Sequence, residues 1–126
     1  MSTRSRIGLM LEDGTIKHSY CHFDGYPHGV GHTLVGHYSE IEKVKELLSF
    51  GDMSFLSPKL NPEGEHSFGN PEKDVTVFYG RDRGESDVDS VITSMEWLAK
   101  AGSTYSAVSF ALGYALEITK SGTNSG

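Results

Sequence analysis

Residues 21–32 concentrate side chains that could do chemistry. The segment contains a cysteine, three histidines, an aspartate and a tyrosine, together with three glycines. A thiol beside a histidine is the pattern of a nucleophile, clustered imidazoles suit a metal, and glycines at a helix entrance let backbone amides approach an anion. None of the established signatures for these activities is complete, so each is weighed below against an ordinary structural role.

Cys21 is the only cysteine and directly precedes His22. Adjacent residues of a strand point to opposite faces, so this histidine is badly placed to activate this thiol. Another histidine could serve, but the ordinary role of such a cysteine is a small apolar core residue. A single cysteine also excludes an internal disulfide and fits a reducing cytoplasm. The sequence therefore favours a protein without a catalytic residue.

The histidines offer at most a weak metal site. His28 and His32 are spaced i, i+4 and would share one face of a helix, and His22 with Asp24 could complete a metal shell. The glutamate of a His-Glu-x-x-His helix is missing, so hydrolytic zinc chemistry is not indicated. Surface histidines are the ordinary alternative, and we predict no metal and no other cofactor.

A ligand site at the same segment is the other possibility. Positive charge would come from Arg81 and Arg83 in the run 81–85, because guanidinium groups suit a phosphate or a carboxylate. Two structural interpretations compete with this one. In the first, the glycines serve only a tight strand-to-helix turn, and in the second, the charges of 81–85 pair with one another in a solvated turn. With Tyr79 as a further wall, the residues of a nucleotide-sized pocket would be Asp24, Tyr26, Gly29, Gly31, His32, Arg81 and Arg83.

The elements that position these residues begin with a β-hairpin. Apolar residues alternate over 7–11 and 16–22, and Asp13-Gly14 between them is typical of a tight turn. A second turn, Asp24-Gly25-Tyr26-Pro27, ends the hairpin, and we expect Gly25 at a positive φ. The spacing of apolar residues then predicts a helix over 29–38.

Ser39 lies three residues before Glu42, which predicts a capping box and a new helix that ends at Gly51. The composition of 52–74 predicts a long irregular connection with an exposed second part that includes Phe68. A central strand is expected at 75–79 because both of its faces are apolar. Ser86 is expected to cap a helix that runs through Leu98 and ends at Gly102.

A second hairpin is predicted with strands near 104–111 and 114–119, because the β-branched and aromatic content favours strands over a helix. The fold class is therefore α+β: an antiparallel sheet, made of two hairpins plus a central strand, packs against two or three helices. Residues 1–120 form a single α+β domain. Residues 121–126 form a tail that we expect to be disordered.

The chain has 126 residues and a net charge of −6, and this charge argues against direct binding to nucleic acids. The short apolar run after the basic N-terminus is interrupted by Glu12-Asp13, so neither a signal peptide nor a membrane span is indicated. A cytoplasmic protein without a membrane partner is expected.

Nine short strings, spread over most of the chain, form a recognisable set. They are Arg6-Ile7-Gly8, Glu12-Asp13-Gly14, Cys21-His22-Phe23-Asp24-Gly25-Tyr26-Pro27, Val30-Gly31, His37-Tyr38, Lys43-Val44, His66-Ser67-Phe68, Val75-Thr76-Val77 and Tyr79-Gly80-Arg81-Asp82-Arg83-Gly84-Glu85. With these strings the chain resembles a family of small proteins, without an assigned activity, that are encoded by tailed bacteriophages and prophages. In that family the position of Phe23 is often tryptophan.

This resemblance implies a phage accessory protein in the cytoplasm of the bacterial host. Such proteins commonly modify or block host machinery, so the expected function is binding and inhibition of a host protein, first of all one of a defence system, without catalysis. The expected contact surfaces are the 52–74 connection, with Phe68, and the aromatic turn at Tyr26. The alternative is a sponge for a nucleotide signal, or a processing enzyme, that uses the junction 24–32.

Overall fold

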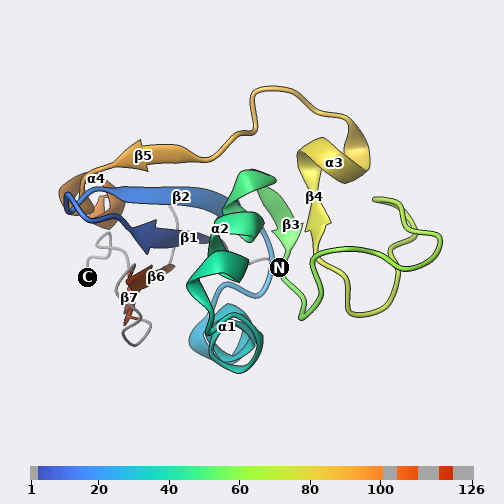
Figure 1. The fold of residues 1–126 in the computed structure, drawn as a ribbon, viewed down its shortest axis with the longest axis horizontal. Helices are drawn as coiled ribbons and strands as arrows, with labels where there is room; N and C mark the ends of the chain where they lie inside the picture. Colours follow the sequence, from blue (N-terminus) through green and yellow to red (C-terminus); the bar gives the residue numbers. More distant parts are fainter. Residues whose placement is uncertain (1–2, 101–104, 111–116, 121–126) are drawn as a thin grey trace.

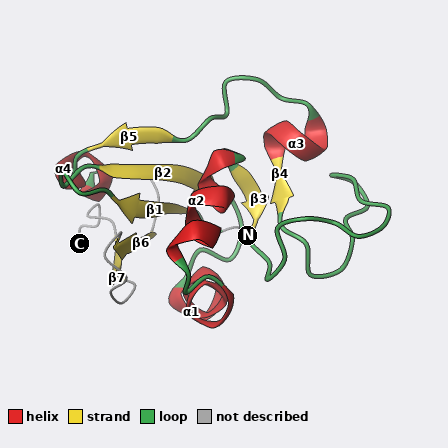
Figure 2. Cartoon of the chain, in the orientation of Figure 1, coloured by secondary structure: helices red, strands yellow, loops and turns green. Residues whose placement is uncertain are grey.

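The protein folds around one seven-stranded mixed sheet. The structure is a computed structural model that describes residues 3–100, 105–110 and 117–120 (Figure 1). The strand order is β4-β3-β2-β1-β6-β7, and β5 also pairs with β2 (Figure 2). The strands are β1 (Ser5–Met10), β2 (Ile16–Cys21), β3 (Met53–Phe55), β4 (Val77–Phe78), β5 (Val91–Thr93), β6 (Tyr105–Phe110) and β7 (Glu117–Lys120).

Helical segments lie between these strands, so the α+β class is confirmed. They are one turn of π-helix, η1 (Pro27–Gly31), and the helices α1 (His32–His37), α2 (Ile41–Ser49), α3 (Tyr79–Arg83) and α4 (Met95–Ala99). Within the described ranges, no helix is long and apolar enough to cross a membrane.

Both predicted hairpins are present. β1 and β2 pair antiparallel, and the turn between them has Gly14 at φ +87° and Asp13 Oδ1 accepting a hydrogen bond from Thr15 N–H at 2.9 Å. β6 and β7 also pair antiparallel. Their connection at 111–116, Gly102 and the tail at 121–126 lie outside the described residues. The sheet is largely antiparallel, but the β1–β6 and β2–β3 pairs are parallel.

The main core lies between the sheet and the helices α1 and α2. The predicted apolar spacing is confirmed, because Val30, Leu34 and Tyr38 are all buried. In α2 the apolar residues Val44, Leu47 and Leu48 are buried as well, and Gly51 follows the helix at φ +81°. A smaller cluster on the opposite face of the sheet packs α4 against β2 and β6 through Ile16, Leu98 and Val108.

The strand predicted to be central is instead an edge strand. β4 lies at one end of the strand order, and its partner is β3. Its residues are nevertheless buried on both sides, because the preceding segment folds back alongside: Lys59 N–H donates to Asp74 O, and Thr76 N–H donates to Lys59 O, both at 2.9 Å. Residues 52–74 are not irregular throughout, because Met53–Phe55 at the start of this segment form β3.

The helix predicted from Ser86 to Leu98 is wrong. Its middle forms β5, because the β-branched run at 91–93 pairs with β2 and this pairing overrides the helical spacing. Only α4 is helical, and its cap is Ser94, whose side chain accepts from Trp97 N–H. The capping box at Ser39 is also wrong, because Glu40 occupies the N-cap position of α2 without a side-chain hydrogen bond.

A buried histidine connects β2, β5 and α4. Arg6 Nε donates to His18 Nδ1 at 2.8 Å, so the ring proton is on Nε2, which lies 2.7 Å from Thr93 Oγ1. The ring of Trp97 stacks on the imidazole at 5.4 Å. Burial, with a smaller contribution from Arg6, lowers the pKa of His18 to about 4. A neutral imidazole is therefore part of the folded state.

The protein is expected to lose stability as the pH falls through the range between 6.5 and about 4. A histidine whose pKa is lower in the folded than in the unfolded state stabilises the fold fully above the unfolded value, and this contribution declines below it. From neutral pH to pH 5, the free energy of unfolding should drop by about 2 kcal/mol through His18 alone. Urea titrations across this pH range measure the drop, and His18→Gln should make the free energy of unfolding less dependent on pH. If the pH dependence in that variant equals that of the parent, His18 is not its source.

Candidate functional site

The junction after β2 is a rigid corner. Phe23 N–H donates to Ser54 O at 2.9 Å, and Gly25 N–H donates to Thr3 O at 2.8 Å. The expectation of a positive φ at Gly25 is wrong: Asp24 adopts φ 55° instead, a conformation that aspartate tolerates better than most residues. Gly25 is required for a different reason, because a Cβ there would lie 2.6 Å from Ser5 Cβ.

The amides at the helix entrance are already bonded within the corner. Gly29 N–H donates to Tyr26 O at 2.9 Å, and Val30 N–H donates to Asp24 O at 2.8 Å. A Cβ on Gly29 would overlap Asp24 O. Gly31 is buried in the turn. The glycines therefore serve the tight strand-to-helix turn, and these amides do not face an anion.

Two large aromatic side chains project from this corner. The exposed fractions are 41% for Phe23 and 39% for Tyr26. The Phe23 ring meets the His22 ring edge to face at 4.5 Å, and the Tyr26 hydroxyl donates to Asp24 Oδ1 at 3.3 Å. We call His22, Phe23, Asp24 and Tyr26 the aromatic corner. Its backbone is fixed while its rings face solvent.

Cys21 and His22 point to opposite faces, as expected. Cys21 is fully buried, and burial raises the pKa of its thiol to about 12, so the thiol is not a nucleophile near neutral pH. His22 Nδ1 lies 2.7 Å from the Tyr20 hydroxyl. His28 and His32 are exposed. In the part of the chain that the structure describes, no group of three or more His, Cys, Asp or Glu side chains could hold a metal ion.

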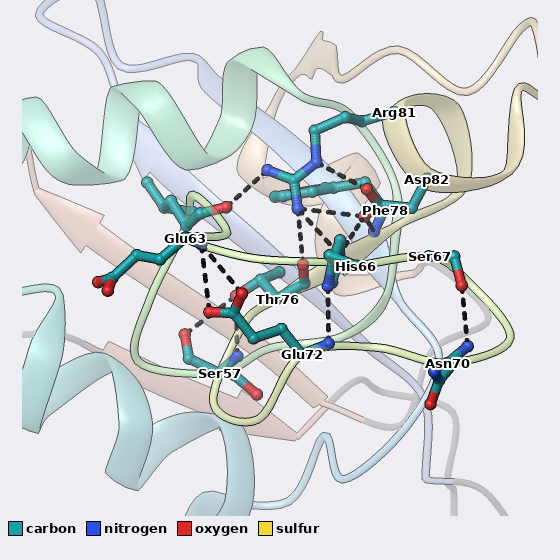
Figure 3. Close-up of polar contacts among 11 residues, drawn as sticks. Ser57, Glu63, His66, Ser67, Asn70, Glu72, Thr76, Phe78, Arg81 and Asp82 are labelled. Atoms are coloured by element: carbon teal, nitrogen blue, oxygen red, sulfur yellow. Dashed lines mark hydrogen bonds and ion pairs between the residues drawn. The ribbon is translucent and has the colours of Figure 1, made fainter.

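Arg81 is held inside the structure and does not face the aromatic corner. Its guanidinium donates to Leu60 O at 2.6 Å, to Thr76 O at 2.9 Å and to Asp82 Oδ1 at 2.9 Å (Figure 3). The same group lies over the Phe78 ring, with Cζ 4.8 Å from the centroid. All of these contacts are internal, so Arg81 ties α3 to the segment before β4. The nucleotide pocket that would need Arg81 beside Tyr26 is not assembled.

His66 and Asp82 extend this arrangement, and no sequence pattern indicates their pairing. His66 Nδ1 accepts from Glu72 N–H at 3.0 Å, so its proton is on Nε2, which lies 3.2 Å from Asp82 Oδ2 (Figure 3). Burial alone would raise the pKa of Asp82, but hydrogen bonds from Arg81, Phe78 N–H and His66 outweigh it and hold the pKa below its usual value. We call Arg81, Asp82 and His66 the clamp.

Phe68 and Arg83 form a separate surface patch on the outer side of the clamp. The Phe68 ring lies 5.6 Å from the Tyr79 ring, and Arg83 Cζ lies 4.8 Å above it. Arg83 also pairs with Glu85 at 3.2 Å, as the solvated-turn interpretation of 81–85 predicts. The predicted site residues thus fall into two groups: Asp24, Tyr26, Gly29, Gly31 and His32 at the corner, and Arg81 in the clamp with Phe68 and Arg83 in the patch beside it.

A hollow of about 360 Å³ lies between the first hairpin and α2. It is lined by Leu9, Leu11, Glu12, Asp13 and Lys45, none of which is a predicted site residue.

Comparison with known proteins gives no further assignment. No family model matches the chain, and neither a curated protein nor a solved structure is significantly similar to it.

Proposed function

We propose that this chain is a phage accessory protein that binds and inhibits a bacterial protein in the host cytoplasm, without catalysis. The observation that carries the proposal is the aromatic corner. Large rings that remain exposed on a fixed backbone lose little conformational entropy on binding, and aromatic residues are enriched at the energetic centres of protein interfaces. A defence-system protein is the first class of target, because the resemblance to phage proteins points there.

Three side chains of types used in catalysis have structural roles in this protein. The thiol of Cys21 is buried and protonated near neutral pH. The carboxylate of Asp82 and the imidazole of His66 bond to each other inside the clamp, and the second nitrogen of this ring accepts a backbone N–H. A general base needs a free nitrogen within reach of a substrate proton, which this ring does not offer.

Asp24 adopts a positive φ at the corner, as Asp74 and Asp87 do elsewhere in the described residues. Aspartate enters this conformation at a lower cost than most residues, and it persists where the surrounding structure holds it. Here the neighbouring backbone bonds of Phe23, Gly25 and Val30 hold the conformation. The result is that Phe23 and Tyr26 both reach solvent from one turn.

The double variant Phe23→Ser, Tyr26→Ser should fold like the parent and lose its partner. Both rings are more than a third exposed, so the melting temperature should change little. Loss of two interface anchors should weaken binding by about 2 kcal/mol or more, which is roughly thirtyfold. The measurement is capture of host proteins from lysates of defence-positive strains, with identification by mass spectrometry and titration of the purified partner.

Val35→Ser is the matched control, because Val35 is an exposed apolar residue of α1 with 66% of its surface accessible. It should capture the partner as the parent does. Equal capture by the double variant would remove the aromatic corner as the contact surface. Absence of any specific partner across the strains would count against the proposed function itself.

A further inference from the structure

β5 is a short edge strand that exposes apolar side chains. The exposed fractions are 43% for Val91 and 58% for Ile92. Figure 1 shows β5 at the outer margin of the sheet beside β2, and β2 is its strand partner among the described residues. Proteins usually protect such an edge with charge, proline or a covering segment, because it can pair with another chain.

The hydrogen-bond pattern shows which backbone groups of β5 face outward. Tyr20 N–H donates to Asp52 Oδ1 and His22 N–H donates to Met53 O, so the even-numbered residues of β2 direct their backbone groups away from β1. His18 is paired with Val91 in the antiparallel register, and Lys17 is paired with Ile92. Because bonded and non-bonded pairs alternate, the N–H and C=O of Ile92 both point to the free edge.

The segment before β5 brings negative charge to the same edge. Asp87 and Asp89 are exposed, and Val88 O accepts from Asp52 N–H at 2.7 Å, which fixes this segment against the body of the protein. A strand that pairs antiparallel with β5 through Ile92 would run past Asp89 and then Asp87. Basic side chains three to five positions after the paired residue would meet these carboxylates.

We infer that the β5 edge accepts an extended segment of a partner protein, with β-branched residues at alternate positions followed by lysine or arginine. The backbone of Ile92 supplies two hydrogen bonds, and its side chain and that of Val91 supply apolar contact on the two faces. This inference deepens the proposed function by naming the kind of segment bound, and it rests on the chain acting by binding a protein.

A second copy of this chain is a poor occupant of the edge. The residues three to five positions after Ile92 are Met95, Glu96 and Trp97, which lie in α4 and include no basic residue. A second copy therefore offers no positive charge to Asp87 and Asp89, and each copy carries a net charge of −6. A basic segment satisfies the same carboxylates.

The test is selection of random ten-residue peptides, displayed on yeast, against the immobilised full chain. Enriched sequences should show alternate β-branched residues followed by lysine or arginine. Ile92→Pro should lower the enrichment at least about tenfold, because proline removes the outward N–H while leaving the bonds to β2 intact. Ile92→Thr, which keeps the N–H and the preference for a strand, should retain most of it.

A charge variant keeps the test decisive if Ile92→Pro is poorly folded. Asp87→Asn combined with Asp89→Lys should shift the selected peptides away from basic residues at the flank, with circular dichroism unchanged. The inference is overturned if the parent enriches no peptides, or if the enriched peptides lack basic residues. It is also overturned if folded Ile92→Pro enriches the same peptides equally, or if the parent sediments as a dimer that Ile92→Pro dissociates. If the Phe23→Ser, Tyr26→Ser variant enriches the same peptides as the parent, the β5 edge binds independently of the aromatic corner. Failure of the edge and failure of the corner can therefore be told apart.

Discussion

Arg81→Ala should lower the free energy of unfolding by about 3–5 kcal/mol, the loss seen when one partner of a buried charged network is removed. The guanidinium serves two backbone carbonyls, Leu60 O and Thr76 O, and the Asp82 carboxylate. Truncation would leave both carbonyls without this donor and would remove one of the donors to the Asp82 carboxylate, which keeps Phe78 N–H and His66. The packing over Phe50 and Phe78 would be lost as well. Chemical denaturation of the purified variant measures the effect.

Arg83→Ala is the matched control on the same helix. Its guanidinium pairs with Glu85 while more than half of the Arg83 side chain is exposed, so the change should stay within about 1 kcal/mol. Equal stability losses for the two arginines would contradict the structural role given to the clamp. Limited proteolysis adds a local readout, because cleavage at 61–74 should accelerate in Arg81→Ala before the whole domain unfolds.

Gly29→Ala should destabilise the protein by about 3 kcal/mol. The added Cβ would overlap Asp24 O, which is a backbone atom that cannot rotate away. Relief would require the corner to open and would disturb the bond from Val30 N–H to the same oxygen. Thermal and urea unfolding of the variant provide the measurement.

Gly36→Ala makes the same chemical change a few residues later, with the opposite expected sign. Gly36 lies inside α1, and a Cβ there meets nothing within 4 Å. Alanine in a helix is favoured over glycine by about 1 kcal/mol, so this variant should be slightly more stable than the parent. If both variants shift stability in the same direction, close packing at Gly29 is not the reason for its glycine.

Local patterns predicted the elements whose partners are adjacent in the sequence. The first hairpin was predictable because Asp13-Gly14 and the alternation on either side are all local signals. The buried spacing of Val30, Leu34 and Tyr38 could be found in the same way. The second hairpin also needed only local information, although its parallel pairing with β1 did not follow from it.

Predictions failed where a distant partner decides the structure. Val91, Ile92 and Met95 fit a helical spacing, but residues 91–93 pair with the open edge of β2. Both faces of 75–79 are apolar, which suggested a central strand, yet the covering segment comes from residues 56–60. Gly25 was expected to supply a positive φ, whereas its role depends on the approach of Ser5 from another strand.

The candidate site was predictable only as a location. The sequence identified the 21–32 segment and Tyr26 as a binding residue, but it left open whether Tyr26 is exposed and did not identify Phe23 as a second exposed ring. Arg81 was expected to bind a ligand because guanidinium groups suit anions. Patterns in a single sequence do not show that its guanidinium instead donates to the backbone carbonyls of Leu60 and Thr76. His66 and Asp82 were missed for the same reason.

The parallel pairing of β1 with β6 bears on how the chain folds during synthesis. β1 and β6 are about a hundred residues apart in the sequence. While translation proceeds, β1 can pair with β2, but its other side has to wait until β6 has left the ribosome. Such a late, non-local pairing slows folding and leaves an apolar strand open to other nascent chains. Overexpression in the cold or with chaperones should therefore improve the soluble yield more than any substitution in the helices.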